Sequence, residues 1–193
     1  MADPTVFALA VLAVLATPGP TNTLMAVAGA TVGLRKGLRL IPAEVAGYLT
    51  SISLLIFIFQ PVVAALPSAA TVLRIGCGSY LAILAITIWR ASNRDAGQTS
   101  LVSFQRVFIT TLLNPKSLIF AFQIFPTGGI RLTLSFLGAF ALICVAAATM
   151  WICIGATLRL RTQAFLTGVA IRRFTAIVLG LFAILFLATA IRT

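Results

Sequence analysis

Six long apolar runs dominate the chain, and polar or basic residues separate them. The runs cover about residues 5–30, 40–66, 70–89, 107–125, 132–158 and 175–191. A helix needs roughly 20 apolar residues to cross the hydrocarbon core of a bilayer. Strands of a membrane barrel would instead alternate polar and apolar positions. Because lipid offers the backbone no hydrogen-bond partner, the pattern predicts an all-α membrane protein with six transmembrane helices.

The composition strengthens this prediction. Of the 193 residues, 61% are hydrophobic and only 9% are charged, with a mean hydropathy of +1.13. A soluble domain carries about a quarter charged residues, so the outer surface of this protein must face lipid. Six helices use most of the chain, and we therefore expect a single transmembrane domain over residues 1–193 in the cell (inner or plasma) membrane. The start lacks a basic segment, which favours a retained first helix over a cleaved signal peptide.

The net charge of +11 comes from basic residues that lie between the apolar runs and form no single patch. This distribution argues against nucleic-acid binding and for a topology signal, since lysine and arginine favour cytoplasmic loops. Only two basic residues fall on the opposite side, so both termini are predicted to lie outside. The residues assigned to the cytoplasmic side are Arg35, Lys36, Arg39, Arg90, Arg94, Arg106, Arg159, Arg161, Arg172 and Arg173.

Two of the six runs contain a proline break, and these are the first and the fourth. The breaks are Thr17-Pro18-Gly19-Pro20 and Asn114-Pro115-Lys116. Each would open a set of three helices, at about residues 1–90 and 106–193, with a polar cytoplasmic loop at about 91–105. GSYLAILAITIWR (78–90) and GLFAILFLATAIR (180–192) also align. A set of three helices ends on the opposite side of the membrane from where it begins. The second set would therefore be inverted relative to the first, as in many secondary transporters.

Both breaks fall near the middle of the bilayer and predict a binding site. Proline removes an amide donor, and irregular backbone is tolerated in a membrane only where it lines a cavity or is covered by protein. The freed amides of a restarted half-helix could hold a carboxylate. The alternative is a proline kink used for packing. The predicted substrate-binding residues are Pro18, Gly19, Pro20, Thr21, Asn22, Asn114, Pro115, Lys116 and Tyr48.

Two charged residues fall inside the runs and are candidates for the transport chemistry. Lys116 lies near the midplane, where an unpaired charge costs at least about 3 kcal/mol. It could neutralise a substrate carboxylate, pair with a carboxylate of the protein, or extend toward an interface. Glu44 is the only carboxylate within any run. It is either a proton carrier or an acid at the start of a helix, paired with Arg39 or Lys36.

Several kinds of chemistry are absent from the sequence. The chain has no histidine, which excludes Ser-His triads and histidine-based zinc or haem sites. It also lacks a P-loop for ATP hydrolysis. We therefore expect no enzyme activity, no cofactor and no metal.

Three segments carry a resemblance to a known family. TPGPTN (17–22), LLNPKSLIF (112–120) and GCGSYLAILAITIWR (76–90) resemble the LysE/RhtB family of amino-acid exporters. The resemblance implies efflux of amino acids or related small metabolites from the cytoplasm, driven by the proton motive force. The chain departs from the family in two places: Thr21 separates Asn22 from the second proline, and Glu44-Val45-Ala46-Gly47 stands where glycines and an aspartate are more usual.

Three functions are therefore considered. The first is an amino-acid exporter in which the substrate lies between the two breaks, its carboxylate meets Lys116, and Glu44 relays protons. The second is efflux of an organic or metal cation that exchanges with the proton on Glu44. The third is a membrane scaffold or enzyme without transport. A homodimer is compatible with each function, because a second copy of a short six-helix chain would help to enclose a pathway.

Overall fold

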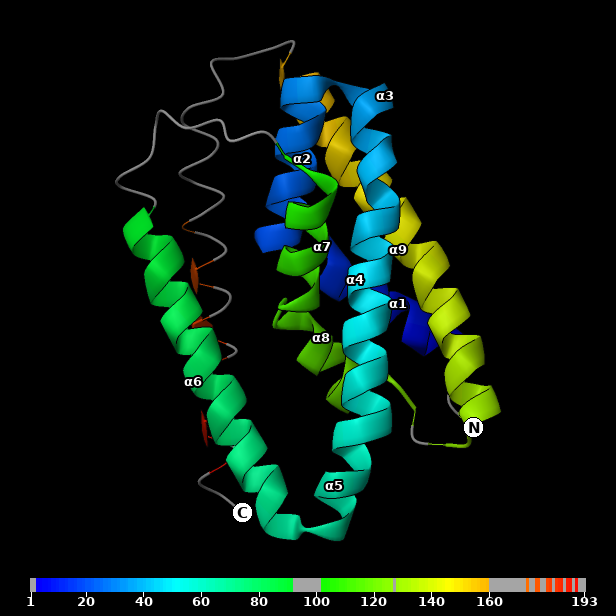
Figure 1. Ribbon diagram of the computed structural model, residues 1–193, viewed down its shortest axis with the longest axis vertical. Helices are drawn as coiled ribbons and strands as arrows, with labels where there is room; N and C mark the ends of the chain where they lie inside the picture. The colour runs from blue at the N-terminus through cyan, green and yellow to red at the C-terminus, as the bar shows by residue number, and fades with distance from the viewer. Residues whose placement is uncertain are drawn as a thin grey trace. The chain divides into compact units, whose positions relative to one another are not determined.

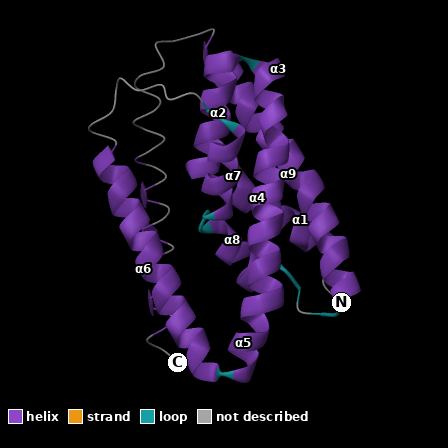
Figure 2. Cartoon of the chain, viewed as in Figure 1, coloured by secondary structure: helices purple, strands orange, loops and turns teal. Residues whose placement is uncertain are grey.

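The computed structural model describes residues 3–91, 102–126 and 128–159, together with scattered positions between 173 and 190. All the regular structure in these residues is helical, with no strand among them (Figures 1 and 2). The prediction of an all-α protein rich in apolar helices is therefore confirmed for the described part of the chain.

The first apolar run forms two helices with a sharp bend between them. Helix α1 spans Pro4–Ala16 and helix α2 spans Pro20–Val32, and their axes differ by 64°. Pro20 fits the first turn of α2 because that position needs no amide donor. The break therefore lies where the proline-glycine-proline sequence predicts it.

Asp3 is the N-cap residue of α1. It accepts hydrogen bonds from the backbone amides of Thr5 and Val6, which would otherwise lack a partner at a helix start. These amides, with that of Thr5 foremost, lower the pKa of Asp3 below its ordinary value.

The second run is a nearly continuous helical stretch. Gly33, with a φ of 84°, allows the tight turn from α2 into it. The span of Leu34–Val62 is long and apolar enough to cross a membrane, and it starts earlier than the sequence predicts. Its parts are α3 (Leu34–Gly37), a 3-10 turn (Leu38–Leu40), α4 (Ile41–Leu54), a π-helical turn (Leu55–Phe59) and α5 (Gln60–Ala65).

The fourth run is also broken, as predicted. Helix α7 spans Phe104–Leu112, and α8 spans Lys116–Ile119 and continues into a π-helical turn over Phe120–Ile124. The two halves are bent by 47°. The following helix, α9, spans Ile130–Arg159 and is the longest helix of the described residues.

Helix α6 corresponds to the third run and spans Pro67–Ala91. The sixth run and segment 180–192 are described only at scattered positions, and most of loop 91–105 lies outside the described residues. By length and apolarity, two described helical stretches can cross a membrane, and each of the two bent pairs can form one more span. The count of six and the inverted repeats remain predictions.

The chain divides into two compact units. The first comprises Met1–Leu55 and Leu101–Thr162, and the second comprises Ile56–Ser100 and Gln163–Thr193. The first unit thus holds runs one, four and five and the larger part of run two, and the second unit holds the end of run two with runs three and six. The first unit therefore contains most of the first and second helices of each predicted set of three, and the second unit contains the third helix of each set. Whether the chain is one domain built from two repeats remains a prediction.

Close helix packing forms the core of the first unit, where α2 lies along α9 and α4 lies along α7 (Figure 1). Two glycines bring the backbones of α2 and α9 into direct contact. A Cβ at Gly29 would clash with the carbonyl oxygen of Ile152, and a Cβ at Gly155 would clash with that of Ala26. Small residues allow this approach in membrane helices, where packing must replace the hydrophobic effect.

In the second unit, α6 packs against the described positions of the last segment. A Cβ at Gly78 would lie 2.7 Å from the Cγ of Leu187. The guanidinium of Arg173 lies 5.7 Å from the ring centre of Trp89, over its face, a favourable cation–π geometry.

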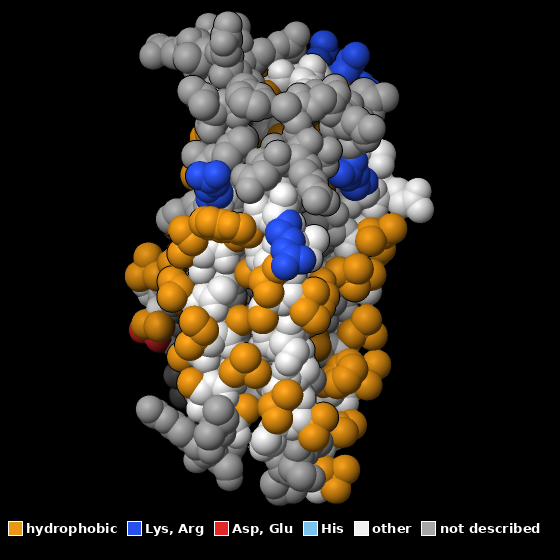
Figure 3. Space-filling view, turned by 90° about the vertical axis from the view of Figure 1, so that its left-hand side faces the viewer, with side chains coloured by type: hydrophobic (Ala, Val, Ile, Leu, Met, Phe, Trp, Pro, Cys, Tyr) orange, Lys and Arg blue, Asp and Glu red, His pale blue; other side chains and the backbone are white. Residues whose placement is uncertain are grey.

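The surface carries large apolar side chains. Leu142 is 75% exposed and Val72 is 69% exposed, and hydrophobic side chains are spread over the face shown in Figure 3. In water such a surface would be an aggregation site. Against lipid it is the expected exterior, which agrees with the membrane class.

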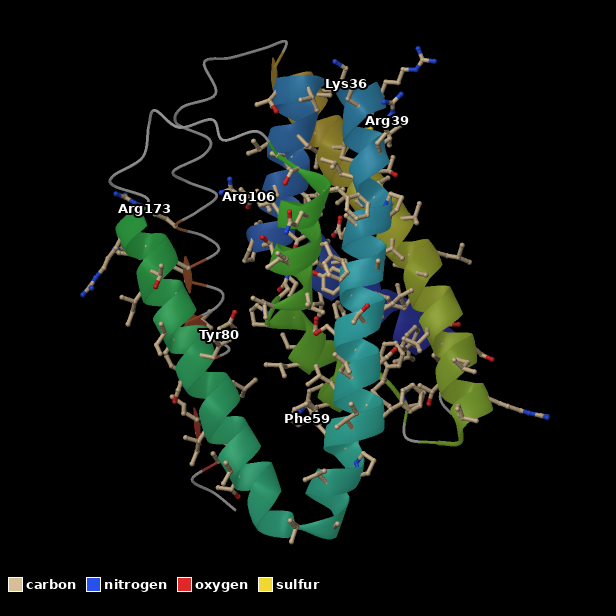
Figure 4. All side chains as sticks on the ribbon, viewed as in Figure 1. Lys36, Arg39, Phe59, Tyr80, Arg106 and Arg173 are labelled. Carbon is tan, nitrogen blue, oxygen red and sulfur yellow. The ribbon has the colours of Figure 1, made fainter. Side chains whose placement is uncertain are left out.

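Two exposed basic side chains of the first unit, Lys36 and Arg39, lie at the end where α3 begins. Figure 4 shows Lys36 and Arg39 beside α3, directed away from the helices. Arg94, Arg161 and Arg172 lie outside the described residues. The assignment of this end to the cytoplasm, with both termini outside, remains a prediction from charge bias.

We expect Gly155→Ala to lower the melting temperature of the purified protein, because the added methyl group meets the backbone of α2. Overpacking of this kind costs about 1–3 kcal/mol. Gly138→Ala is the matched control on the same helix, since a Cβ there meets nothing within 4 Å. Equal melting temperatures for the two variants would contradict the packing of α2 on α9.

Candidate functional site

The break between α1 and α2 leaves the carbonyl oxygens at the end of α1 short of helical partners, because the last carbonyls of any helix have no amide ahead of them in the helix. The carbonyl of Val14 accepts from the amide of Thr17 at 3.3 Å and from its hydroxyl at 2.6 Å. Lys116 reaches two of these carbonyls from the start of α8. Its Nζ donates to the carbonyl of Val14 at 2.9 Å and to that of Thr17 at 2.5 Å. The side chain of Lys116 is only 4% exposed. The lysine of one break therefore binds the open end of the other.

Two further side chains complete the pairing of these carbonyls. The Nδ2 of Asn22 donates to the carbonyl of Leu15 at 2.7 Å and to that of Thr17 at 2.8 Å. The indole Nε1 of Trp151 also donates to the carbonyl of Leu15, at 3.2 Å. Donors from α2, α8 and α9 thus meet at the end of α1, and they hold its irregular backbone inside the protein.

Gly19 provides the space that Lys116 occupies. A Cβ at this position would lie 3.0 Å from the Cε and 3.2 Å from the Nζ of Lys116. The φ of Gly19 is −158°, which any residue can adopt. This glycine is therefore required by the close approach of the lysine and not by the backbone conformation.

A second polar layer joins the two breaks to α4. The Nδ2 of Asn114 donates to the hydroxyl of Thr21 at 2.9 Å and to that of Tyr48 at 3.0 Å. The Oδ1 of Asn114 accepts from the amide of Lys116 at 3.0 Å. The hydroxyl of Thr111 lies 3.2 Å from that of Thr21. Asn114 therefore both starts α8 and fixes the position of Tyr48.

Glu44 lies in the first turn of α4 and is 1% exposed. Its Oε2 has no hydrogen-bond partner among the described residues. Its charge interacts with that of Lys116, whereas Lys36 and Arg39 are exposed at the end of the unit. No hydrogen bond joins Glu44 to Arg39 or Lys36 among the described residues, and its role as a proton carrier stays a prediction.

Aromatic rings border the polar layer. The ring centres of Tyr48 and Phe120, and of Tyr48 and Phe140, are 5.7 Å apart in edge-to-face geometry. Phe120 and Phe140 are 4.9 Å apart, and Phe140 continues to Phe125 at 6.0 Å. Such a cluster is apolar and well packed, and it lowers the dielectric constant around the neighbouring polar groups, which strengthens their electrostatic interactions.

All the predicted site residues lie in the first unit, and the side chains of Thr21, Asn22, Tyr48, Asn114 and Lys116 join in the hydrogen bonds described above. Pro18, Pro20 and Pro115 shape the two breaks.

The sequence analysis missed Thr111, Trp151 and Ser117 as members of the site. Thr111 precedes Asn114 by three residues, so helical periodicity could have placed it on the same face. Ser117 follows Lys116, and its buried hydroxyl has no partner among the described residues. Trp151 is 136 residues from Leu15, and no local pattern could join them.

We expect Asn22→Ala to destabilise the protein by about 1 kcal/mol, because the carbonyls of Leu15 and Thr17 each lose one of their donors and a typical hydrogen bond contributes about 0.5–1.5 kcal/mol. Thermal unfolding of the purified protein would measure the loss. Thr149→Ala is the matched control, since the hydroxyl of Thr149 bonds only to the carbonyl of Val145 in its own helix. The role of Asn22 at the break would be refuted by equal effects in the two variants.

The model of the LysE type translocator family matches residues 12–190, a range that contains both breaks and every predicted site residue. Neither the curated proteins nor the solved structures gave a match.

Proposed function

Because this chain belongs to the LysE type translocator family, it is a membrane exporter of small molecules, and we propose that its substrates are amino acids or related metabolites. We further propose that the proton motive force drives their export. The match confirms the resemblance seen in the TPGPTN and LLNPKSLIF segments, and it favours transport over the scaffold or enzyme alternative.

The observation that carries this proposal is the buried ammonium of Lys116 at the junction of two broken helices. A charge-assisted bond to a carboxylate is stronger than one to a neutral carbonyl. A substrate carboxylate can therefore displace the carbonyls of Val14 and Thr17 from the ammonium. Export substrates with a carboxylate group fit this chemistry.

The start of α2 supports the same placement of the substrate. This helix has no side-chain cap, and the first amides of a helix lack intrahelical acceptors. The amides of Thr21 and Asn22 thus carry the positive end of the helix dipole beside the break. They supply a second source of positive charge for a carboxylate held near Lys116.

Glu44 is our proposed proton carrier. Its carboxyl group is buried, has an oxygen without a partner, and interacts electrostatically with Lys116. Ionisable residues inside membrane proteins commonly form proton relays. A proton entering on Glu44 from outside would be exchanged for a substrate leaving the cytoplasm.

The free oxygen of Glu44 also supports a second candidate function, the efflux of a cationic substrate. In that case the carboxylate alternates between the cation and a proton. Lys116 disfavours this function, because its own positive charge interacts with Glu44 and opposes a second cation.

We expect Lys116→Ala to reduce the export of carboxylate substrates from membrane vesicles by roughly tenfold or more. A hydrogen bond to a charged group contributes about 1.5–3 kcal/mol, and about 1.4 kcal/mol is a factor of ten. Lys36→Ala is the matched control, because Lys36 is the only other lysine and is exposed. Unchanged export by Lys116→Ala would remove this residue from substrate binding.

Glu44→Gln separates coupling from substrate binding, because glutamine keeps the shape of glutamate and cannot change its charge. We expect the variant to exchange labelled amino acids across proteoliposomes but to lose export against a gradient. Asp3→Asn, at an exposed carboxylate outside the apolar run, should retain both activities. If Glu44→Gln still exports uphill, Glu44 is not the proton carrier, and if it keeps resistance to a toxic cation, the second candidate function is also ruled out.

A further inference from the structure

The open end of α1 has the features of a binding site for a monovalent cation. The carbonyl oxygens of Val14 and Thr17 converge on one nitrogen atom. Val14 belongs to the last turn of α1 and Thr17 is its C-cap residue, so both lie at the negative end of the helix dipole. The position is buried, so a cation here is screened little by solvent.

Secondary transporters with broken helices use such carbonyls for ion coupling. Unwound backbone and the carboxyl ends of half-helices coordinate the Na⁺ or H⁺ whose gradient drives transport. In this protein the position is filled by a lysine ammonium, a compact point charge on a flexible stem. Gly19 leaves the space through which the end of that stem passes.

We propose that the carbonyls of Val14 and Thr17 form the coupling-cation site of this carrier, and that Lys116 occupies it in place of a dissolved ion. Binding and release of a free cation are thereby replaced by docking and undocking of one side chain. This inference rests on the proposed transport function and adds that no dissolved alkali cation takes part.

The ionisable groups that interact electrostatically with Lys116 or with Glu44 lie on two helices. Glu44 and Tyr48 belong to α4, and Cys144 belongs to α9. Helices α1 and α2 contribute no ionisable side chain. Of these groups, only an ionised Glu44 has an oxygen ready to accept a hydrogen bond. An ionised Glu44 or a substrate carboxylate favours undocking, and a protonated Glu44 favours the docked state.

Chemical rescue tests the site directly. Lys116→Ala removes three methylene groups and the ammonium, which together correspond to propylammonium. We expect propylammonium chloride to raise the melting temperature of this variant by about 2–4 °C. Tetramethylammonium chloride at the same concentration carries the same charge but donates no hydrogen bond, and it should have no effect.

The wild-type protein and Lys36→Ala are the controls, and neither should respond to propylammonium, because their cation site is already filled. Equal effects of the two salts on Lys116→Ala would overturn the proposal. If the variant can be purified only with propylammonium present, that result supports the site.

A second measurement needs no variant. The melting temperature of the wild-type protein should be the same in Na⁺ as in choline, and amino-acid export should not depend on Na⁺. A stabilisation specific to Na⁺, or export that requires it, would overturn the proposal. The melting experiments do not depend on the identity of the substrate. If the wild-type protein does not export amino acids, the proposed function is refuted. The cation site would then still be tested by the propylammonium rescue of Lys116→Ala.

Discussion

The hydrogen bonds from the Lys116 ammonium to the carbonyls at the end of α1 are the contact on which the rest of the first unit depends. A helix interrupted inside a membrane exposes polar backbone that lipid cannot satisfy. Here the donor comes from a second interrupted helix, so each break supports the other. The buried charge of Lys116 would be unfavourable alone. The carbonyls of Val14 and Thr17, which also accept from Thr17 and Asn22 respectively, satisfy it and so stabilise one arrangement.

The surrounding structure brings these two breaks into contact. Gly29 and Gly155 let α2 and α9 approach backbone to backbone, which carries Trp151 to the carbonyl of Leu15. Asn114 bonds to Thr21 and Tyr48 and so fixes α7 and α4 relative to α2. The aromatic cluster around Phe140 keeps the polar layer in an apolar setting. Tight packing therefore brings the two breaks next to each other, and the polar contacts favour this one arrangement of the helices.

The same arrangement explains how a small carrier can change state. Lys116 has neutral acceptors in the described conformation, and the oxygen of Glu44 stands free nearby. Stronger, charged acceptors can compete for the ammonium whenever they appear. In the mechanism that we propose, a single cation shared among competing acceptors links substrate binding, protonation and the bend between α1 and α2.

The sequence by itself determined the membrane class, the helical structure of the described runs and the positions of both breaks, because hydropathy and proline act locally. It also singled out Lys116 and Glu44, since charges inside apolar runs are conspicuous. Only the tertiary structure decided their partners. The contact of Lys116 with Val14 spans 102 residues, and the partners of Trp151 and Gly155 are equally distant in the chain. Such contacts arise from helix packing, which depends on the shapes of facing surfaces and leaves no periodic signal along the chain.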